Sequence, residues 1–371
     1  MSWFYGLFFF CILYQIIYLF VLILSIVKYK KVTPGNSSIS LPQPTVSLII
    51  CSKNEAENLL RNIPLILNQN YPDFEVIIVD DGSDDQTVEV VNGFKNQFSR
   101  VRLISISKEE KIGLGKKYAL QTGIANTSND LILLTDADCN PVSQNWISEM
   151  SSRINDQHKI VLGISPYETK NTFLNGLIEY ETAQTALQYV GFALLGNPYM
   201  SVGRNVCCEK KLWTSKPWTN EEFSIASGDD DLAIQKLATG MNTTVCLSID
   251  SYILSQPKET LDEWIHQKLR HYESGKLYKS SHRLLLGAYL FTKSVLYISM
   301  LSFVFTHILT VVILSIFFLY LFLITILNFM MQKKQQLNSR WFLASFFDVI
   351  YCIFAVALGF VSLLKTNRNW K

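Results

Sequence analysis

The sequence predicts an α/β domain built on a mainly parallel β-sheet. Apolar helices before and after this domain in the sequence are expected to anchor it to a membrane. Two observations predict this arrangement. Long apolar stretches lie near the two ends of the 371-residue sequence, and short β-rich runs alternate with helical segments between residues 45 and 283. Strands that alternate with helices indicate βαβ units and a parallel sheet covered on both faces.

The first apolar stretch, residues 3–27, contains no charged residue and is long enough to cross a hydrocarbon core of about 30 Å. It lacks the basic start and the small-residue cleavage site of a signal peptide, so we interpret residues 1–30 as a retained transmembrane helix. Lys28, Lys30 and Lys31 follow the stretch directly. Because lysine and arginine mark the cytoplasmic flanks of spanning helices, the domain that follows is expected in the cytoplasm, at a plasma or inner membrane.

Residues 284–371 are expected to form about three further transmembrane helices. The apolar run 284–330 is long enough for two helices, and the run 341–364 supplies another. Basic residues between 331 and 340 mark a cytoplasmic loop, but the same count leaves the basic tail on the opposite side. The number of spans in 284–330 and the side of the tail therefore stay open. Asp348 should face other helices, since a carboxylate against lipid is costly.

Composition argues against several other classes of protein. The net charge is +2, which does not favour nucleic acid as a partner. The seven cysteines include no CxxC pair. This pattern fits unpaired thiols in a reducing compartment better than a disulfide scaffold or a zinc site.

Between the apolar ends, four runs are expected to be strands and three segments between them helices. The strands are 45–51, 75–79, 101–106 and 131–135, and the helices are 55–69, 84–98 and 115–126. In parallel sheets, ligands bind beyond the carboxyl ends of the strands. The polar residues that follow the strands are therefore the candidate site residues.

Acidic residues follow three of these strands. Glu55 comes after the first, Asp80 and Asp81 after the second, and Asp136 and Asp138 after the fourth. Taken singly, each is compatible with a turn or a helix cap. Two carboxylates at positions i and i+2 beyond a strand can also share Mg²⁺ or Mn²⁺, which is commonly bound by one or two carboxylates together with substrate phosphates. The combination favours a site for a nucleotide sugar.

Four motifs, "SLIICSKNEAENL", "EVIIVDDGSDD", "GKKYAL" and "LTDADC", occur in this order. Their order and spacing resemble the family 2 glycosyltransferases of the GT-A fold. The resemblance covers residues 45–275, and it implies a transferase domain over residues 45–257.

The resemblance also implies roles for the acids and for one lysine. The implied contacts to the nucleotide sugar are Glu55, Asp80, Asp81, Lys116 and Asp136. Asp80 and Asp81 are equal candidates for the contact to the base, and Lys116 would approach the nucleoside or the diphosphate. Asp136 and Asp138 would hold the metal ion, Mg²⁺ or Mn²⁺.

Glycosyl transfer also requires a base, because the acceptor hydroxyl is a poor nucleophile. The segment "SGDDDLAIQKLATG", residues 227–240, offers three acids before a helical run. The family often has Glu-Asp-x-Asp-Leu here, and the spacing to Gly240 places its catalytic aspartate on Asp229. Asp230 is the alternative, and Gly228 stands where the family usually has an acid.

A segment upstream, "MSVGRNVCCEKKLW", resembles the acceptor-side segment of the family. The resemblance puts Gly203, Arg204 and Asn205 at the acceptor pocket.

Residues 258–283 are expected to form an amphipathic helix. Leu261, Ile265, Leu269 and Tyr272 make an apolar stripe at helical spacing. Such a stripe fits an interfacial helix that lies on the membrane surface, and the alternative is an amphipathic helix packed on its own domain.

Within that helix, "QKLRH" resembles the QxxRW motif of membrane-integrated members such as cellulose and hyaluronan synthases. The resemblance implies that Arg270 neutralises the leaving diphosphate, a role suited to a guanidinium group, and that Gln267 and His271 lie on the acceptor side. His271 replaces the tryptophan of the motif, which leaves the identity of the acceptor open.

The sequence therefore predicts a membrane-bound glycosyltransferase that moves a sugar from a nucleotide sugar, UDP-linked in the preferred interpretation, to a lipid or lipid-linked acceptor. Inversion at the anomeric carbon is implied by the resemblance alone. A processive polysaccharide synthase of the hyaluronan or cellulose type is an alternative, although a translocating pore usually needs more spans or partners. An alternative of another class is a non-catalytic membrane protein that binds nucleotide sugars, which would be marked by loss of the paired acids or of the base.

Overall fold

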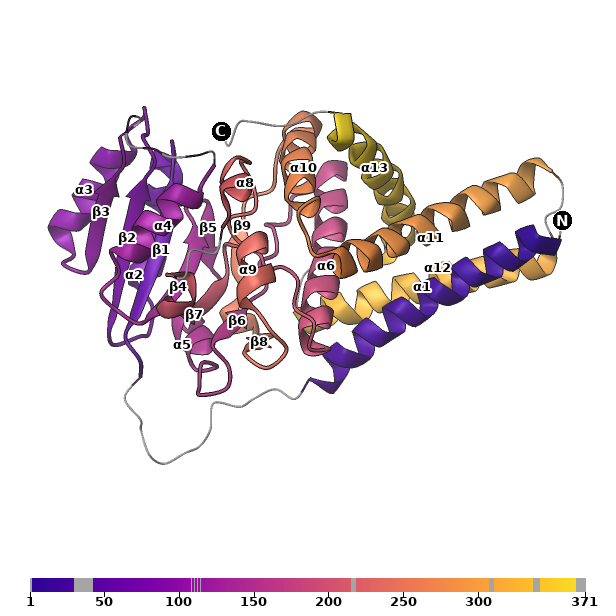
Figure 1. Cartoon of the computed structure of the whole chain (residues 1–371), viewed down its shortest axis with the longest axis horizontal. Helices are drawn as coiled ribbons and strands as arrows, with labels where there is room; N and C mark the ends of the chain where they lie inside the picture. Colours follow the sequence, from indigo (N-terminus) through magenta and orange to yellow (C-terminus); the bar gives the residue numbers. More distant parts are fainter. Residues whose placement is uncertain are drawn as a thin grey trace. The chain divides into compact units, whose positions relative to one another are not determined.

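The structure is a computed structural model of the chain (Figure 1). It describes residues 2–29, 43–107, 109, 111, 113, 115–214, 218–306, 310–335 and 341–364. Lys30, Lys31, Arg340 and the basic tail lie outside the described residues.

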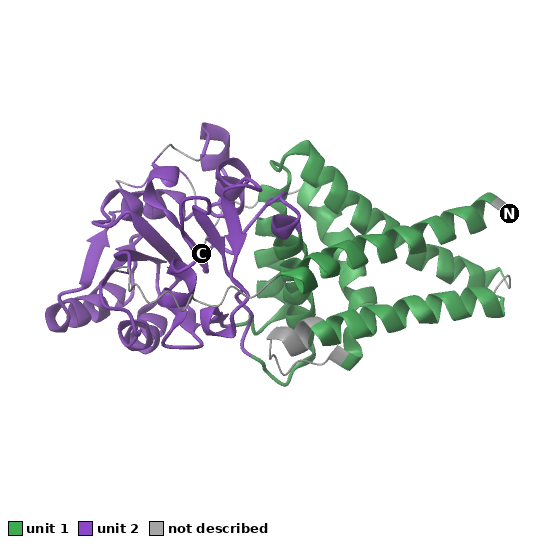
Figure 2. Cartoon of the chain, turned by 90° about the horizontal axis from the view of Figure 1, so that it is seen from below, with its two compact units in different colours: residues 1–29, 169–191, 257–366 green, residues 30–168, 192–256, 367–371 purple. Residues whose placement is uncertain are grey.

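Two compact units make up the chain, and neither is continuous in sequence (Figure 2). Unit 1 contains Met1–Tyr29, Thr169–Gly191 and Pro257–Thr366, and unit 2 contains Lys30–Glu168, Phe192–Gln256 and Asn367–Lys371.

Unit 2 is built on a mixed sheet with the strand order β3-β2-β1-β4-β7-β6-β8. Its strands are β1 (Val46–Ser52), β2 (Phe74–Asp80), β3 (Val101–Ser105), β4 (Leu131–Asp136), β6 (Ile160–Leu162), β7 (Val206–Glu209) and β8 (Thr243–Val245). The strands β1 to β4 are parallel to one another. Strand β7 is antiparallel to both β4 and β6, and β8 is parallel to β6. A second, two-stranded sheet pairs β5 (Cys139–Pro141) with β9 (Ile253–Ser255).

The central strands read as continuous apolar runs because both faces of the sheet are covered. Every residue of β1 is buried, and so is every residue of β4 before Asp136. This is the pattern expected of a parallel sheet between two layers of helices. The four predicted strands agree with β1 to β4 to within one residue at each end.

The helices of unit 2 are short and join the strands. They are α2 (Ala56–Leu67), α3 (Thr87–Gln97), α4 (Lys117–Ala125), α5 (Trp146–Ser151), α7 (Lys210–Trp213), α8 (Asn220–Phe223) and α9 (Asp231–Leu237), with a 3-10 turn at Ile249–Ser251. The three predicted helices agree with α2, α3 and α4 to within three residues at each end.

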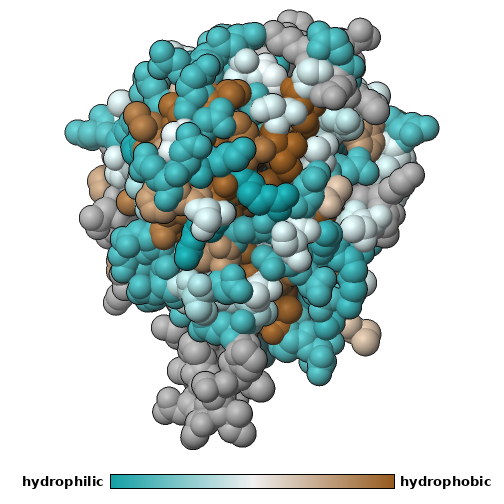
Figure 3. All heavy atoms as spheres, turned by 90° about the vertical axis from the view of Figure 1, so that its left-hand side faces the viewer, coloured by the Kyte–Doolittle hydropathy of each residue, from teal (hydrophilic) through white to brown (hydrophobic). Residues whose placement is uncertain are grey.

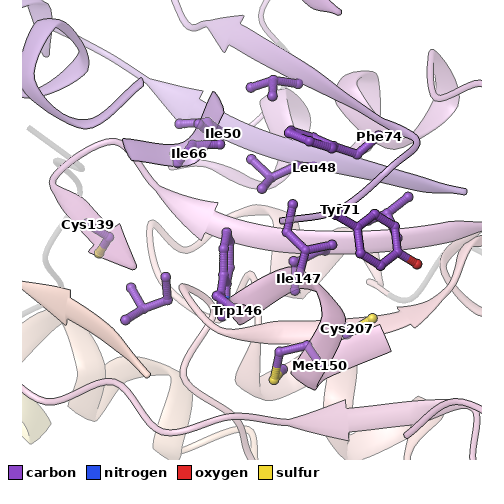
Figure 4. Packing of buried hydrophobic residues seen from close by; sticks show 14 of the residues in the cluster. Leu48, Ile50, Ile66, Tyr71, Phe74, Cys139, Trp146, Ile147, Met150 and Cys207 are labelled. Carbon is purple, nitrogen blue, oxygen red and sulfur yellow. The ribbon is translucent and has the colours of Figure 1, made fainter. Parts of the chain in front are cut away.

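One apolar cluster fills the space between the central strands and the helices α2 and α5 (Figure 4). It includes Leu48 and Ile50 of β1, Ile66 of α2 and Trp146 of α5. The indole nitrogen of Trp146 donates a hydrogen bond to Asn205 Oδ1 at 3.0 Å, which satisfies its one polar atom inside the core. On the side of unit 2 where α3 and β3 lie, the surface is mainly hydrophilic (Figure 3).

Unit 1 consists of long helices, namely α1 (Ser2–Lys28), α6 (Phe173–Leu194), α10 (Leu261–Gly275), α11 (Ser280–Phe305), α12 (Val311–Gln335) and α13 (Ala344–Leu364). Among the described residues, four stretches are long and apolar enough to cross a membrane, namely Trp3–Lys28, Ser280–Phe305, Val311–Met330 and Ala344–Leu364. The prediction of one such helix before the α/β domain and three after it is confirmed. Asp348 is fully buried among the helices of unit 1, as its cost in lipid requires.

The amphipathic helix α10 buries a side centred on Trp264. The Trp264 ring meets the Phe354 ring edge-on with centroids 5.4 Å apart, and the buried Lys268 forms an ion pair with Glu181. Leu261, at the start of the predicted apolar stripe, is 46 % exposed. Contact of this stripe with the membrane surface stays a prediction.

Two glycine substitutions test the packing of the helices on the sheet. A Cβ atom at Gly123 in α4 would lie 2.9 Å from Cγ2 of both Ile49 and Val79. Overpacking of this kind costs about 1–3 kcal/mol, which outweighs the roughly 1 kcal/mol that alanine gains over glycine in a helix. Gly123→Ala is therefore expected to lower the midpoint of thermal unfolding.

The matched control is Gly93→Ala in α3, where a Cβ would meet nothing within 4 Å. This substitution should leave the midpoint unchanged or raise it, because only the helix propensity changes. A midpoint that rises in both variants would contradict the close packing of α4 on the sheet.

Candidate active site

The site begins with the register of the parallel strands. Ser52 at the end of β1 pairs with Asp80 at the end of β2, and Cys51 pairs with Asp136 at the end of β4. The carboxyl ends of the three strands therefore lie side by side. The acids that follow β2 and β4 come to one edge of the sheet, where ligands of such sheets bind.

The two acids after β2 have different surroundings. Asp80 accepts hydrogen bonds from the hydroxyl of Ser83 and from its backbone N–H, at 3.3 Å, and so closes the turn after the strand. The helix that follows begins only at Thr87, with Gln86 as its N-cap residue.

Asp81 is 3 % exposed and pairs through Oδ2 with Lys111. Burial raises the pKa of the Asp81 carboxyl, against the opposing effect of Lys111. Its other oxygen, Oδ1, is buried without a hydrogen-bond partner among the described residues. A buried oxygen without a partner is uncommon, and it offers an acceptor to an N–H group of a ligand. The geometry therefore favours Asp81 over Asp80 as the ligand contact.

Glu55 lies where the chain leaves β1, at the N-cap position of α2. Its side chain is largely buried and accepts a hydrogen bond from Asn58, and its backbone N–H donates to Thr87 Oγ1 at 2.9 Å. The preceding residue, Asn54, donates its backbone N–H to Ser83 Oγ at 2.8 Å. These contacts tie the end of β1 to the turn that follows β2.

At the end of β4 and directly after it, the ligand atoms of Asp136, Asp138 and Cys139 lie within 4.8 Å of one another. The Cys139 thiol donates a hydrogen bond to Asp138 Oδ1 at 3.3 Å. Burial raises the pKa of this thiol well above its ordinary value, so the sulfur keeps its proton. The two carboxylates are thus the donors suited to a hard divalent cation such as Mg²⁺ or Mn²⁺, and the thiol orients one of them.

Lys116 joins these carboxylates to the acids before α9. Its ammonium group forms an ion pair with Asp136 and lies 3.6 Å from Asp229 Oδ2. Burial would lower the pKa of Lys116, but the two carboxylates raise it well above its ordinary value. The side chain therefore remains a cation inside the site.

The neighbouring acids Asp229 and Asp230 are distinguished by their partners. Asp230 accepts a hydrogen bond from the backbone N–H of Gly203, and burial, with Asp229 and Asp231 beside it, raises its pKa well above the ordinary value. Asp229 instead faces Lys116. A pocket brings these groups together, and its wall includes Cys51, Lys116, Thr135, Gly203, Asp229 and Asp230.

The loop that carries Asp229 is held in place by Lys117. The Lys117 side chain is fully buried, and its ammonium group donates hydrogen bonds to the backbone carbonyls of Ile225, at 2.9 Å, and of Ser227. Gly115 has a φ of +74°, and a Cβ there would lie 2.1 Å from the Ala226 carbonyl oxygen. Sequence reasoning did not single out Lys117, although the second lysine of "GKKYAL" was the available signal.

The candidate acceptor residues Arg204 and Asn205 both make contacts inside unit 2. The Arg204 guanidinium donates to Ser165 Oγ at 2.6 Å and to its carbonyl oxygen at 2.9 Å, and lies 4.7 Å from the centre of the Tyr167 ring. Asn205 is fully buried, and its amide donates to the carbonyls of Ile164, at 2.8 Å, and Ser251, at 2.9 Å. Asn205 therefore holds backbone segments together within unit 2.

The remaining predicted residues lie on α10, which belongs to unit 1. Gln267 and His271 are four residues apart and share one face of this helix, and Arg270 precedes His271. The other predicted site residues all belong to unit 2. The roles of these three residues stay predictions.

Comparison with known families gives two matches. Residues 47–201 match the family described as "Glycosyl transferase family 2", and residues 131–363 match the one described as "Glycosyl transferase family group 2". The second match covers more than half of the 371 residues.

Several relatives share parts of the sequence. Glycosyltransferase AglE from Haloferax volcanii is 34 % identical over 113 residues, 30 % of this chain and 36 % of the relative. Poly-beta-1,6-N-acetyl-D-glucosamine synthase from Staphylococcus epidermidis is 33 % identical over 95 residues, 25 % of this chain and 21 % of the relative. Beta-monoglucosyldiacylglycerol synthase from Synechocystis sp. is 28 % identical over 127 residues, 32 % of this chain and 26 % of the relative. The chain thus spans well under half of the length of these relatives.

Among solved structures, the fold is similar to that of the mannosyltransferase PcManGT from Pyrobaculum calidifontis in complex with GDP-Man and Mn²⁺. The TM-score is 0.63 at 15 % sequence identity, and the match covers 96 % of this chain and 97 % of that one. At this identity the likeness concerns the fold alone. It confirms the predicted GT-A fold with its apolar helices.

Loss of the Lys117 ammonium group should loosen the loop that carries Asp229. A hydrogen bond from a charged group contributes about 1.5–3 kcal/mol, so Lys117→Met is expected to speed amide hydrogen exchange in residues 223–230 by roughly tenfold or more. Hydrogen exchange followed by mass spectrometry measures this. The control is Lys95→Met at an exposed lysine of α3, which should change nothing there. Unchanged hydrogen exchange in the Lys117 variant would show that the hydrogen bonds of Lys117 do not hold this loop.

Proposed function

The chain belongs to the family 2 glycosyltransferases, and on this premise we propose that it is an inverting, membrane-bound enzyme. It transfers a sugar from a UDP-linked donor to the hydroxyl of a lipid or lipid-linked acceptor. One observation carries the proposal: in unit 2, Lys116 contacts both a carboxylate of the paired acids after β4 and the candidate base Asp229.

Asp136 and Asp138 are the residues proposed to hold the metal ion. Their convergence after β4 and the protonated thiol beside them support a hard cation, Mg²⁺ or Mn²⁺. When bound, such an ion neutralises charge on the donor diphosphate. The related fold of PcManGT was solved with GDP-Man and Mn²⁺, which favours a nucleoside-diphosphate sugar as the donor class.

Asp81 is the proposed contact to the base of the donor. Its unpartnered, buried Oδ1 can accept the N3–H of uracil, a contact that a base without this donor would lack. Asp80 supports it by closing the turn, and Glu55 lies at the neighbouring strand end.

Asp229 is the proposed base. As the acceptor oxygen attacks the anomeric carbon, the acceptor proton passes to the Asp229 carboxylate. The bond between that carbon and the diphosphate oxygen breaks on the opposite face, and its electron pair leaves with UDP. Lys116 supplies positive charge within the site for the departing diphosphate, and Arg270 is the proposed second cation. Fixed charges that meet developing charge in this way give large rate effects.

Arg204, Gln267 and His271 are proposed to line the acceptor side. Asn205 is proposed to act from behind them, since all its described contacts are to the protein interior.

The proposed location is the cytoplasmic side of a plasma or inner membrane. The four apolar helices support integration into a membrane, and the lysines that follow the first of them favour a cytoplasmic transferase domain. The proposed divisions are a helix in 1–30, the transferase domain in 45–257, an interfacial helix in 258–283 and the remaining spans in 284–371.

A lipid acceptor and a growing polysaccharide are the two candidates for the acceptor. The activity in the name of the Synechocystis relative favours a lipid, and that in the name of the Staphylococcus relative favours a polymer. We prefer the lipid because the described residues contain four candidate spans, fewer than a pore usually needs. Chromatography of radiolabelled product separates the two, as a single glycolipid or as a ladder.

Asp229→Asn should lower turnover by roughly 10²–10⁴-fold, the usual contribution of a general base. The assay is release of UDP from UDP-sugars by the purified chain with Mn²⁺ and a total lipid extract. Asp73→Asn, at an exposed acid before β2, is the control and should keep full turnover. Full turnover in the Asp229 variant would remove this residue from the mechanism and return Asp230 as the candidate.

A further inference from the structure

The helices of unit 1 enclose a cluster of polar side chains that the proposed transfer does not use. Lys293 of α11 and Asp348 of α13 form an ion pair with side chains 3 % and 0 % exposed. The hydroxyls of Tyr180 and Tyr297 donate hydrogen bonds to the Asp348 carboxylate. Lys293 also donates to the hydroxyl of Tyr289 at 2.7 Å. Ionisable groups inside spanning helices are costly and rare, so a cluster of them indicates a function beyond packing.

A pocket lies beside this cluster, and its wall is partly polar and partly apolar. The polar side includes Gln184 of α6, Lys293 and Asn328 of α12. The apolar side includes Leu187, Ile324 and Leu327. A wall with both kinds of side chain suits an amphiphilic ligand that has a polar head and a hydrocarbon chain.

The polar side of the pocket keeps unused hydrogen-bonding capacity. The Gln184 amide N–H donates to Asn328 Oδ1 at 3.0 Å, and no group among the described residues donates to the Gln184 carboxamide oxygen. Lys293 uses two of its three N–H groups, on Tyr289 and Asp348. A hydroxyl group can donate to the Gln184 oxygen and accept from the Lys293 ammonium group, so the wall complements a hydroxyl.

The charge of the pocket selects against an anionic head. Lys293 and Asp348 neutralise each other, and both line the pocket. A phosphate would meet the Asp348 carboxylate as well as the ammonium group, with no net positive charge to offset its desolvation. An uncharged head loses far less on entering such a site.

We propose that this pocket binds the polar head of an uncharged, hydroxyl-bearing lipid of the diacylglycerol type. Gln184 and Lys293 hold the head, and the apolar side packs against the start of the acyl chains. The assignment of this lipid as the acceptor class, in place of a polyprenyl phosphate, rests on the proposed function. Binding itself does not, because it is a property of unit 1 alone.

Binding is measured with the purified full chain in detergent and no sugar donor, using fluorescent diacylglycerol and fluorescent polyprenyl phosphate as probes. The chain is expected to bind diacylglycerol at least tenfold more tightly than polyprenyl phosphate. Gln184→Leu should weaken the binding of diacylglycerol by roughly fivefold to tenfold, since it removes one hydrogen bond to a neutral group. The matched control is Thr325→Val, which removes a polar contact to Ser345 Oγ, at 2.7 Å, away from the pocket wall, and it should not change the binding.

Three results would overturn the proposal: no preference between the two probes, tighter binding of polyprenyl phosphate, or equal weakening by the two substitutions. If the Gln184→Leu variant does not fold, photo-crosslinking of the unmodified chain with a photoactivatable diacylglycerol tests the pocket instead. Labelled peptides should come from residues 180–187 and 324–328, and labelling confined to other segments would contradict the pocket.

The proposed glycosyl transfer can be tested separately from the proposed lipid pocket. Slow release of UDP from a UDP-sugar with Mn²⁺ but no lipid does not require the residues of this pocket. Release of UDP without binding of diacylglycerol would contradict the proposed lipid pocket and leave the proposed transfer standing. Binding of diacylglycerol without release of UDP in any assay would contradict the proposed transfer and leave the lipid pocket standing.

Discussion

The buried ammonium group of Lys116 is the interaction on which the candidate site depends. It contacts Asp136 and lies 3.6 Å from Asp229, two carboxylates from segments more than ninety residues apart in sequence. Without a cation between them, carboxylates this close in a partly buried site would repel each other. One ammonium group does not balance the carboxylates of Asp136, Asp138 and Asp229, so the proposed diphosphate would need the proposed divalent cation beside it.

Close backbone contacts support this charge arrangement. The parallel register of β1, β2 and β4 fixes one wall of the site. Lys117 and Gly115 hold the loop that carries Asp229, the first through its ammonium group and the second through the absence of a Cβ. The two adjacent lysines thus have different contacts. Lys116 pairs with carboxylate side chains of the site, whereas Lys117 donates hydrogen bonds to backbone carbonyls of the loop that carries Asp229. In unit 1, Lys293 and Asp348 form a second buried ion pair among apolar helices.

Much of the fold could be predicted because its signals are local. An apolar run such as Leu131–Thr135 forms a strand wherever both sheet faces are covered, and an uncharged run such as residues 3–27 forms a spanning helix. The β5–β9 pair was not predicted, since three-residue strands have no periodicity of their own. The grouping of Thr169–Gly191 with the spanning helices was missed for a similar reason, because it depends on contacts such as that of Tyr180 with Asp348.

The candidate site followed from the sequence only where a motif places acids directly after strands. Asp81, Asp136 and Asp229 could be named in this way, but their partners could not. The preference for Asp81 over Asp80 depends on which carboxylate closes the turn with Ser83. The preference for Asp229 over Asp230 depends on the Gly203 N–H that takes up the second acid. Neither contact can be predicted from the spacing of residues in the sequence.

Binding of Mn²⁺ in the presence of UDP tests the central claim most directly, since it reports on the paired acids without any acceptor. Electron paramagnetic resonance measures the free Mn²⁺ in a titration of the purified chain. The account predicts that UDP increases the affinity of the unmodified chain for Mn²⁺ and that Asp138→Asn abolishes this increase. Equal binding of Mn²⁺ by the two proteins, with or without UDP, would contradict a metal and donor site at the end of β4.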